Sequence, residues 1–104
     1  MPPFRSERLA NGIELTFFDR SNRYFGDYHR VSVEVRLAVP TPAGTIETVR
    51  HCERMAVPGA GVIAVRDRLA ADFLEHAGRY LAHPDYPERF AAATAVRGRP
   101  RLRR

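Results

Sequence analysis

Apolar and polar side chains alternate most regularly between residues 31 and 39. The apolar positions of this segment are Val31, Val33, Val35, Leu37 and Val39, and most of the intervening positions are polar. Alternation with a period of two predicts a strand with one buried face and one solvated face. Residues 40–44, rich in proline and glycine, predict a turn. A further strand is expected from about Thr45 to Val57, and its poor alternation predicts a sheet edge or a bulge.

The N-terminal part of the chain has the pattern of a β-hairpin. Two strand-like runs, residues 4–10 and 13–18, flank Asn11-Gly12. This pair favours a type I′ turn because both residues tolerate a positive φ. The first run has few apolar residues, so we expect it at an edge of the sheet. We interpret residues 19–27 as a connection to the valine-rich strand.

Beyond Gly61 the apolar pattern changes to the helical period of about 3.6 residues. The residues on one stripe of this helix are Val62, Val65, Leu69, Phe73, Ala77 and Tyr80, with Ile63, Leu74 and Leu81 widening it. This pattern predicts an amphipathic helix over about 62–82. Pro84 ends it. Asp85 and Glu88 then have the spacing of a capping box, which predicts a second, short helix over 87–96.

These elements together predict an α+β fold. We expect a four-stranded, mainly antiparallel sheet from residues 4–57, with the long helix packed on its valine face and the short helix after it. A length of 104 residues fits a single domain. We place this domain at residues 1–96, and the patternless residues 97–104 predict a flexible basic tail.

The composition points to a reducing environment. The single cysteine, Cys52, cannot form an internal disulfide. No apolar run is long enough to span a bilayer, and the first residues lack a signal-peptide pattern. We therefore expect a cytoplasmic protein without a membrane partner.

The net charge of +5 comes from the predicted tail. This tail contains no acidic residue and five arginines, which are Arg97, Arg99, Arg101, Arg103 and Arg104. The other twelve arginines balance twelve acidic residues. Arg97-Gly98-Arg99-Pro100 matches the core of an AT-hook, which inserts arginines into the narrow minor groove of A·T-rich DNA. Nucleic-acid binding through these arginines is one hypothesis, and a solvated chain end is the other.

Aromatic and basic residues also interleave within the predicted connection and just after it. The residues concerned are Arg20, Arg23, Tyr24, Phe25, Tyr28, His29 and Arg30. Such a segment can stack on single-stranded bases. We favour the alternative interpretation, in which the aromatic side chains cover a hydrophobic edge of the sheet and the arginines point outward.

No motif indicates catalysis, a cofactor or a metal. His51-Cys52-Glu53 offers three metal-ligating residue types, but neighbours in a strand point to opposite faces and cannot converge on one ion. The chain also lacks the spacings of zinc sites, phosphate-binding loops and nucleophile elbows. We therefore expect no catalytic, cofactor-binding or metal-binding residue, and this absence argues against an enzyme.

Three short motifs carry a resemblance to known proteins. They are Phe18-Asp19-Arg20-Ser21, Gly26-Asp27 and the segment from Tyr80 to Phe90. Together they resemble a family of small bacterial proteins of about this length whose function is uncharacterised. The resemblance covers most of residues 13–90. It implies no chemistry, because the family has no assigned activity from which residues could be carried over.

For function, the sequence favours a non-enzymatic interaction or regulatory protein that self-associates. A small sheet with weak edges can bury exposed aromatic surface in a homodimer. The aromatic residues that lie off the main apolar face are Phe18, Tyr24, Phe25 and Tyr28. Weak nucleic-acid binding through the arginine-rich tail is the alternative, and no small-molecule ligand follows from the pattern.

Overall fold

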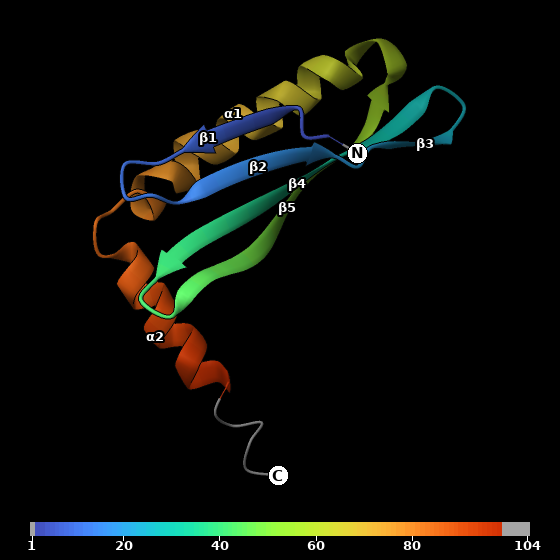
Figure 1. The fold of residues 1–104 in the computed structure, drawn as a ribbon. Coiled ribbons are helices and arrows are strands. Elements are labelled where there is room, and N and C mark those ends of the chain that lie inside the picture. Colours follow the sequence, from blue (N-terminus) through green and yellow to red (C-terminus); the bar gives the residue numbers. More distant parts are fainter. Residues whose placement is uncertain (1, 99–104) are drawn as a thin grey trace.

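The computed structural model describes residues 2–98, with the backbone alone for residues 94–98. Its elements in chain order are β1 (Arg5–Arg8), β2 (Glu14–Asp19), β3 (Asn22–Phe25), β4 (Tyr28–Thr41), β5 (Gly44–Pro58), the 3-10 turn η1 (Gly59–Gly61), α1 (Val62–Leu81) and α2 (Tyr86–Gly98). All strand pairs are antiparallel, and both helices follow the strands (Figure 1). The α+β class and the long helix are confirmed, and α2 continues past residue 96 to Gly98.

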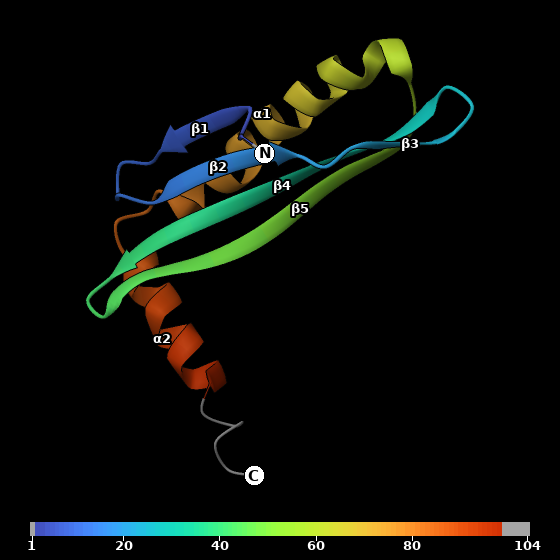
Figure 2. The ribbon, with the colours of Figure 1, turned by 45° about the vertical axis from the view of Figure 1, so that its right-hand side comes forward.

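The longest pairing in the sheet joins β4 and β5. One edge of β4 pairs first with β3, at residues 28–30, and then with β2, at residues 33–38. The other edge pairs with β5 along almost its whole length. β1 extends the sheet on the far side of β2. Three short strands therefore lie on one side of β4, and β5 lies alone on the other (Figure 2).

The connection predicted over residues 19–27 contains a strand, so the sheet has five strands where the pattern indicated four. All four residues of β3 are exposed, and no hydrophobic alternation marks this strand in the sequence. Its pairing depends instead on backbone hydrogen bonds to β4. The tight turn between the two strands uses Gly26, whose φ of 55° favours glycine.

The core lies between α1 and one face of the sheet. The odd-numbered side chains of β4 from Val31 to Val39 are fully buried, which confirms the face predicted from the alternation. Ile13, Leu15 and Phe17 extend this face across β2. α1 lies across it (Figure 1) and places the Phe73 ring edge-on to Phe17, with 6.1 Å between centroids.

Five residues of the predicted stripe of α1 pack in the core as expected, namely Leu69, Phe73, Leu74, Ala77 and Leu81, but the buried stripe is rotated from the predicted one. Tyr80 and Ile63 are exposed, whereas Ala70 and Gly78 are buried. Tyr80 faces a polar neighbour, because its hydroxyl accepts a hydrogen bond from Nη1 of Arg50 at 3.3 Å. A prediction from hydrophobicity alone includes Tyr80 in the buried stripe and omits Ala70 and Gly78.

β5 contains the bulge that its poor alternation predicted. Its register with β4 shifts between His29 and Val31, and Ala56 has a φ of 57°. The extra residue changes which face the following side chains occupy. As a result Val57 is buried against the core side of the sheet, and Met55 is exposed on the opposite side.

The predicted type I′ turn at Asn11-Gly12 is wrong, since the β1–β2 loop has three residues. Gly12 N donates a hydrogen bond to Leu9 O at 3.0 Å, and Leu9 N donates one to Ile13 O at 2.8 Å. The φ angle of Gly12 is 93°, whereas that of Asn11 is negative. This geometry is a type I turn followed by a left-handed glycine. The Asn11 side chain serves the end of α1, because its Nδ2 donates to the carbonyl oxygens of Leu81 and, at 2.9 Å, His83.

We predict that Asn11→Ala lowers the free energy of unfolding by about 1–2 kcal/mol, because carbonyl oxygens at the end of α1 lose their donor. Asn11→Asp should cost more, since it places a carboxylate against those oxygens. Urea denaturation followed by circular dichroism measures both. Ser6→Ala, at an exposed site on β1, serves as the control. If Asn11→Ala and the control have equal stability, the link between hairpin and helix has no energetic role.

We also predict that Ala56→Gly stabilises the protein. The left-handed conformation costs a non-glycine residue about 1–2 kcal/mol, and the extra entropy that glycine loses on folding offsets about half of this. Ala64→Gly, at an exposed position in the first turn of α1, should instead destabilise by about 1 kcal/mol. Thermal unfolding of the two variants should therefore shift in opposite directions, and a shift in the same direction would contradict the strain at Ala56.

Candidate interaction surfaces

The edge of β5 that faces away from β4, here called the free edge, has no strand partner in the described part of the chain. In an antiparallel ladder, successive residues of a strand direct their backbone groups to opposite sides. Ser32 O accepts from Arg20 N on the β2 side of β4, so the odd-numbered residues of β4 bond to β5. Their partners on β5 have even numbers. The residues whose backbone N–H and C=O groups point to the free edge are therefore Thr45, Glu47, Val49, His51 and Glu53.

β5 is only half covered by α1. Its side chains on the helix-covered face are Ile46, Thr48, Arg50, Cys52 and Arg54, and only the last of these is exposed. Its side chains on the opposite face are exposed from Glu47 to Met55, including Val49 at 44%. A long backbone edge thus runs between a half-buried row and an exposed row of side chains.

The face of the sheet opposite α1, here called the open face, is neutralised by its own ion pairs. Glu34 accepts hydrogen bonds from Nε of Arg36 at 2.6 Å and from Nε of Arg20 at 3.2 Å. Both guanidinium groups lie over the Phe18 ring, at 4.6 and 5.4 Å from its centroid. The hydrogen bond from Arg36 and then that from Arg20 lower the pKa of the Glu34 carboxyl.

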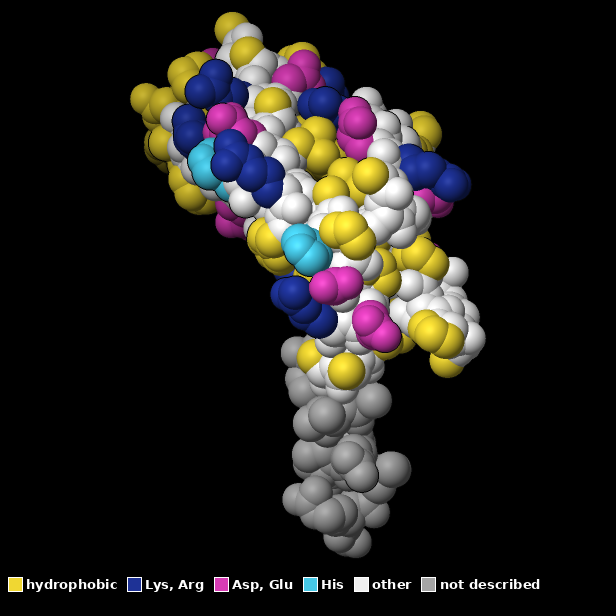
Figure 3. Space-filling view, turned by 90° about the vertical axis from the view of Figure 1, so that its left-hand side faces the viewer, with side chains coloured by type: hydrophobic (Ala, Val, Ile, Leu, Met, Phe, Trp, Pro, Cys, Tyr) yellow, Lys and Arg dark blue, Asp and Glu magenta, His cyan; other side chains and the backbone are white. Residues whose placement is uncertain are grey.

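Other arginines are also paired. Arg30 donates to Asn22 at 3.0 Å and to Glu53 at 3.3 Å, and Arg8 pairs with Glu14. The side of the molecule shown in Figure 3 is a different surface, and there too basic and acidic side chains are interspersed. A folded nucleic-acid-binding surface requires unpaired basic residues along one face. Because Arg8, Arg20, Arg30 and Arg36 are paired with carboxylates, the open face lacks the electrostatics of such a surface.

The interleaved aromatic and basic residues form the β3–β4 hairpin. The interpretation that its aromatic side chains cover a hydrophobic edge is wrong, because Tyr24, Tyr28 and especially Phe25, at 72%, are exposed. Phe25 pairs across the hairpin with Tyr28, next to the turn. The reason is the length of β4, which carries this hairpin past the end of β2 (Figure 2). The hairpin thus presents aromatic surface to solvent.

The three potential metal ligands in β5 do not converge. His51 lies opposite Glu34 on the open face, and Cys52 lies opposite Val33 on the covered face, where it packs against the core. Burial raises the pKa of the Cys52 thiol, which lowers its nucleophilicity at neutral pH. Within residues 2–98 no three ligating side chains are grouped in a way that could hold a metal ion.

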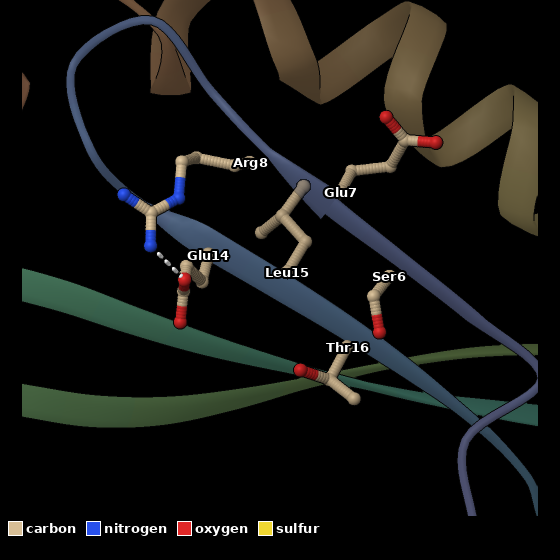
Figure 4. A pocket seen from close by; sticks show the side chains of 6 residues that line it. All are labelled: Ser6, Glu7, Arg8, Glu14, Leu15 and Thr16. Carbon is tan, nitrogen blue, oxygen red and sulfur yellow. Dashed lines mark hydrogen bonds and ion pairs between the residues drawn. The ribbon is translucent and has the colours of Figure 1, made fainter.

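A shallow depression lies along the β1–β2 hairpin. Its volume is about 370 Å³, and it is lined by Ser6, Glu7, Arg8, Glu14, Leu15 and Thr16. Figure 4 shows the Arg8 guanidinium turned toward Glu14, with Glu7 directed to the other side of the strand. The Arg8 guanidinium and the Glu14 carboxylate form an ion pair with each other. The side chains that line the depression are therefore not arranged for acid–base or nucleophilic chemistry.

The arginines proposed to bind nucleic acid lie at the limit of the described chain. Arg97 belongs to the last turn of α2, where only the backbone is described, and Arg99, Arg101, Arg103 and Arg104 lie outside the described residues. Binding through them stays a prediction. No helix in residues 2–98 has the length and apolar character needed to cross a membrane.

Comparison of the chain with protein-family models, with curated proteins and with solved structures gave no match. The resemblance to small bacterial proteins therefore stays a prediction.

Sequence reasoning predicted an edge position for β5 but missed the groove beside it. This groove unites Arg50 of β5 with Tyr80 of α1 and with Tyr86 and Arg89 of α2. No local pattern connects residues that are 30 or more positions apart. The one available signal was the presence of an aromatic residue on each side of the turn at Pro84, Tyr80 and Tyr86.

We predict that Glu34 titrates below the usual range of glutamates and that Arg36→Ala raises its pKa, because the strongest hydrogen bond to the carboxylate is lost. A folded-state pKa below that of the unfolded chain stabilises the fold at neutral pH, and this contribution is lost as the pH falls through the folded-state value. Carboxyl-detected NMR titration measures the change. Arg8→Ala, on the same face, should leave the Glu34 titration unchanged; an equal shift in both variants would rule out a specific pair.

Proposed function

We propose that the protein is a non-enzymatic interaction protein that self-associates through the free edge of β5. The observation that supports this is the length of unpaired backbone along β5, which spans Gly44–Pro58. β1 and β3 are four residues each, so their outer edges offer little to a partner strand. An exposed edge of this length is a template for pairing with another strand.

A second copy of the chain is the occupant that best fits the charges of β5. Antiparallel pairing of two β5 strands about Val49 places Glu47 opposite His51 of the other copy and Val49 opposite itself. On the other face it places Ile46 opposite Cys52 and Thr48 opposite Arg50. No like charges face each other in this register, and all five outward-pointing residues find hydrogen-bonding partners.

Two other registers, centred on Arg50 and on Cys52, are less favourable. Pairing about Arg50 sets this arginine opposite itself and Glu47 opposite Glu53. Pairing about Cys52 sets Arg50 opposite Arg54. Like charges directly opposite each other destabilise a strand pair. The charge pattern of β5 therefore selects pairing about Val49 over these alternatives.

We predict that the wild-type protein is a dimer at micromolar concentration and that Val49→Lys is a monomer with an unchanged melting temperature. The substitution brings two ammonium groups together at the two-fold axis, while Val49 makes no core contact in the single chain. Sedimentation velocity measures both states. Ser6→Lys, at the outer edge of β1, should leave the dimer intact. A wild-type monomer, or a dimer of Val49→Lys as stable as the wild type, would refute the proposal.

The register itself can be tested by cross-linking. In a Cys52→Ala background, Val49→Cys should form a disulfide-linked dimer on oxidation, because the two Cα atoms lie within the range of about 4.4–6.8 Å that a disulfide needs. Glu53→Cys places the two thiols at opposite ends of the interface and should not cross-link. Equal cross-linking of both variants would mean that the β5 edges do not pair about Val49.

A further inference from the structure

A groove lies where β5 emerges from under α1 and α2 passes beside it. Its volume is about 480 Å³, within the usual range for small-molecule sites. Residues from three elements line it, namely Thr48, Arg50, Tyr80, Tyr86, Arg89, Phe90 and Ala93. The half-covered row of β5 side chains forms the floor of the groove, and the helices form its walls.

One wall of the groove is aromatic. The Tyr80 and Tyr86 rings meet edge to face with centroids 5.9 Å apart, and the Tyr86 and Phe90 rings are stacked at 6.0 Å. Tyr86 and Phe90 also pack against the core, which restricts the movement of their rings. Rigid aromatic surface of this kind binds the flat apolar part of a ligand.

The floor of the groove carries an uncompensated positive charge. Arg50 is half-buried, and among the described residues no carboxylate lies within ion-pair distance of it. Its Nη1 is held instead by the Tyr80 hydroxyl at 3.3 Å. That hydrogen bond raises the arginine pKa further, so the charge is permanent. A charge removed from water in this way gains from a bound counter-ion.

A second arginine lies at the rim. Arg89 Nη2 is 3.7 Å from Oδ2 of Asp85, and both side chains are solvent-exposed. An exposed pair at this distance contributes little energy. Arg89 can therefore turn to an anion held by Arg50 without the loss of a strong contact.

We propose that this groove binds a small organic anion with an aromatic body, its carboxylate or phosphate on Arg50 and Arg89 and its ring against Tyr86 and Phe90. Guanidinium groups bind both kinds of oxyanion with charge-assisted hydrogen bonds. All of the lining residues belong to one chain. A single chain is therefore sufficient for the site, although the proposed dimer would place Thr48 of a second copy opposite Arg50. The Val49 side chain lies on the opposite face of the sheet.

The test uses 1-naphthyl phosphate and 1-naphthoate as probes, with neutral 1-naphthol and inorganic phosphate as the matched compounds that lack one half of the ligand. Titration calorimetry should show each anionic naphthyl probe binding at least about tenfold more tightly than either matched compound. The anion that binds more tightly of the two indicates whether the natural ligand carries a phosphate or a carboxylate. Equal binding of 1-naphthol, or no binding of either anion at millimolar concentration, overturns the proposal.

Arg50→Gln keeps a hydrogen-bond donor but removes the charge, so it should weaken both anions about tenfold and leave 1-naphthol unaffected. Arg54→Gln is the control, because Arg54 lies on the same face of β5 but does not line the groove. Equal losses in the two variants would indicate nonspecific attraction and contradict a site. Val49→Lys should retain full binding even where it abolishes the dimer; loss of binding in that variant would refute a site built from one chain.

Discussion

The burial of one face of β4 beneath α1 is the interaction on which the other features of the molecule depend. The valines of that face and the adjacent side chains of β2 are removed from water completely. A single helix covers only a limited width of sheet, and α1 lies over β2 and β4 (Figure 1). β5 pairs with β4 through its backbone, and its side chains on the covered face are only half-buried. Its free edge and the groove beside it are both consequences of a sheet that is wider than its helix.

The open face is a sheet surface that α1 leaves uncovered (Figure 1). Its charged side chains pair with one another, and the cluster of Glu34 with Arg20 and Arg36 also covers the Phe18 ring. Exposed ion pairs of this type contribute little to stability. Their effect is to leave the face without a net charge that would attract a polyanion, so the basic excess of the chain stays with its C-terminal residues.

The parts of the fold that could be predicted are those in which side-chain pattern and burial agree. The alternation from Val31 to Val39 and the helical period after Gly61 both follow directly from contact with the core. β3 could not be predicted, because its pairing uses backbone groups that any sequence supplies. The loop at Asn11 was misjudged because its side chain bonds residues about 70 positions away. The groove depends on the same kind of distant contact, between Arg50 and Tyr80.

The order of the elements along the chain has a consequence for synthesis. All five strands precede α1, and each pairs with a neighbour close in sequence, so the sheet can assemble while the chain is still being made. Its valine face has nothing to cover it until residue 81 and the segment after it have left the ribosome. During this interval the nascent chain presents an apolar surface together with unpaired strand edges, the combination that leads to aggregation and that chaperones recognise. The speed at which the last third of the chain is translated therefore sets how long the protein stays vulnerable.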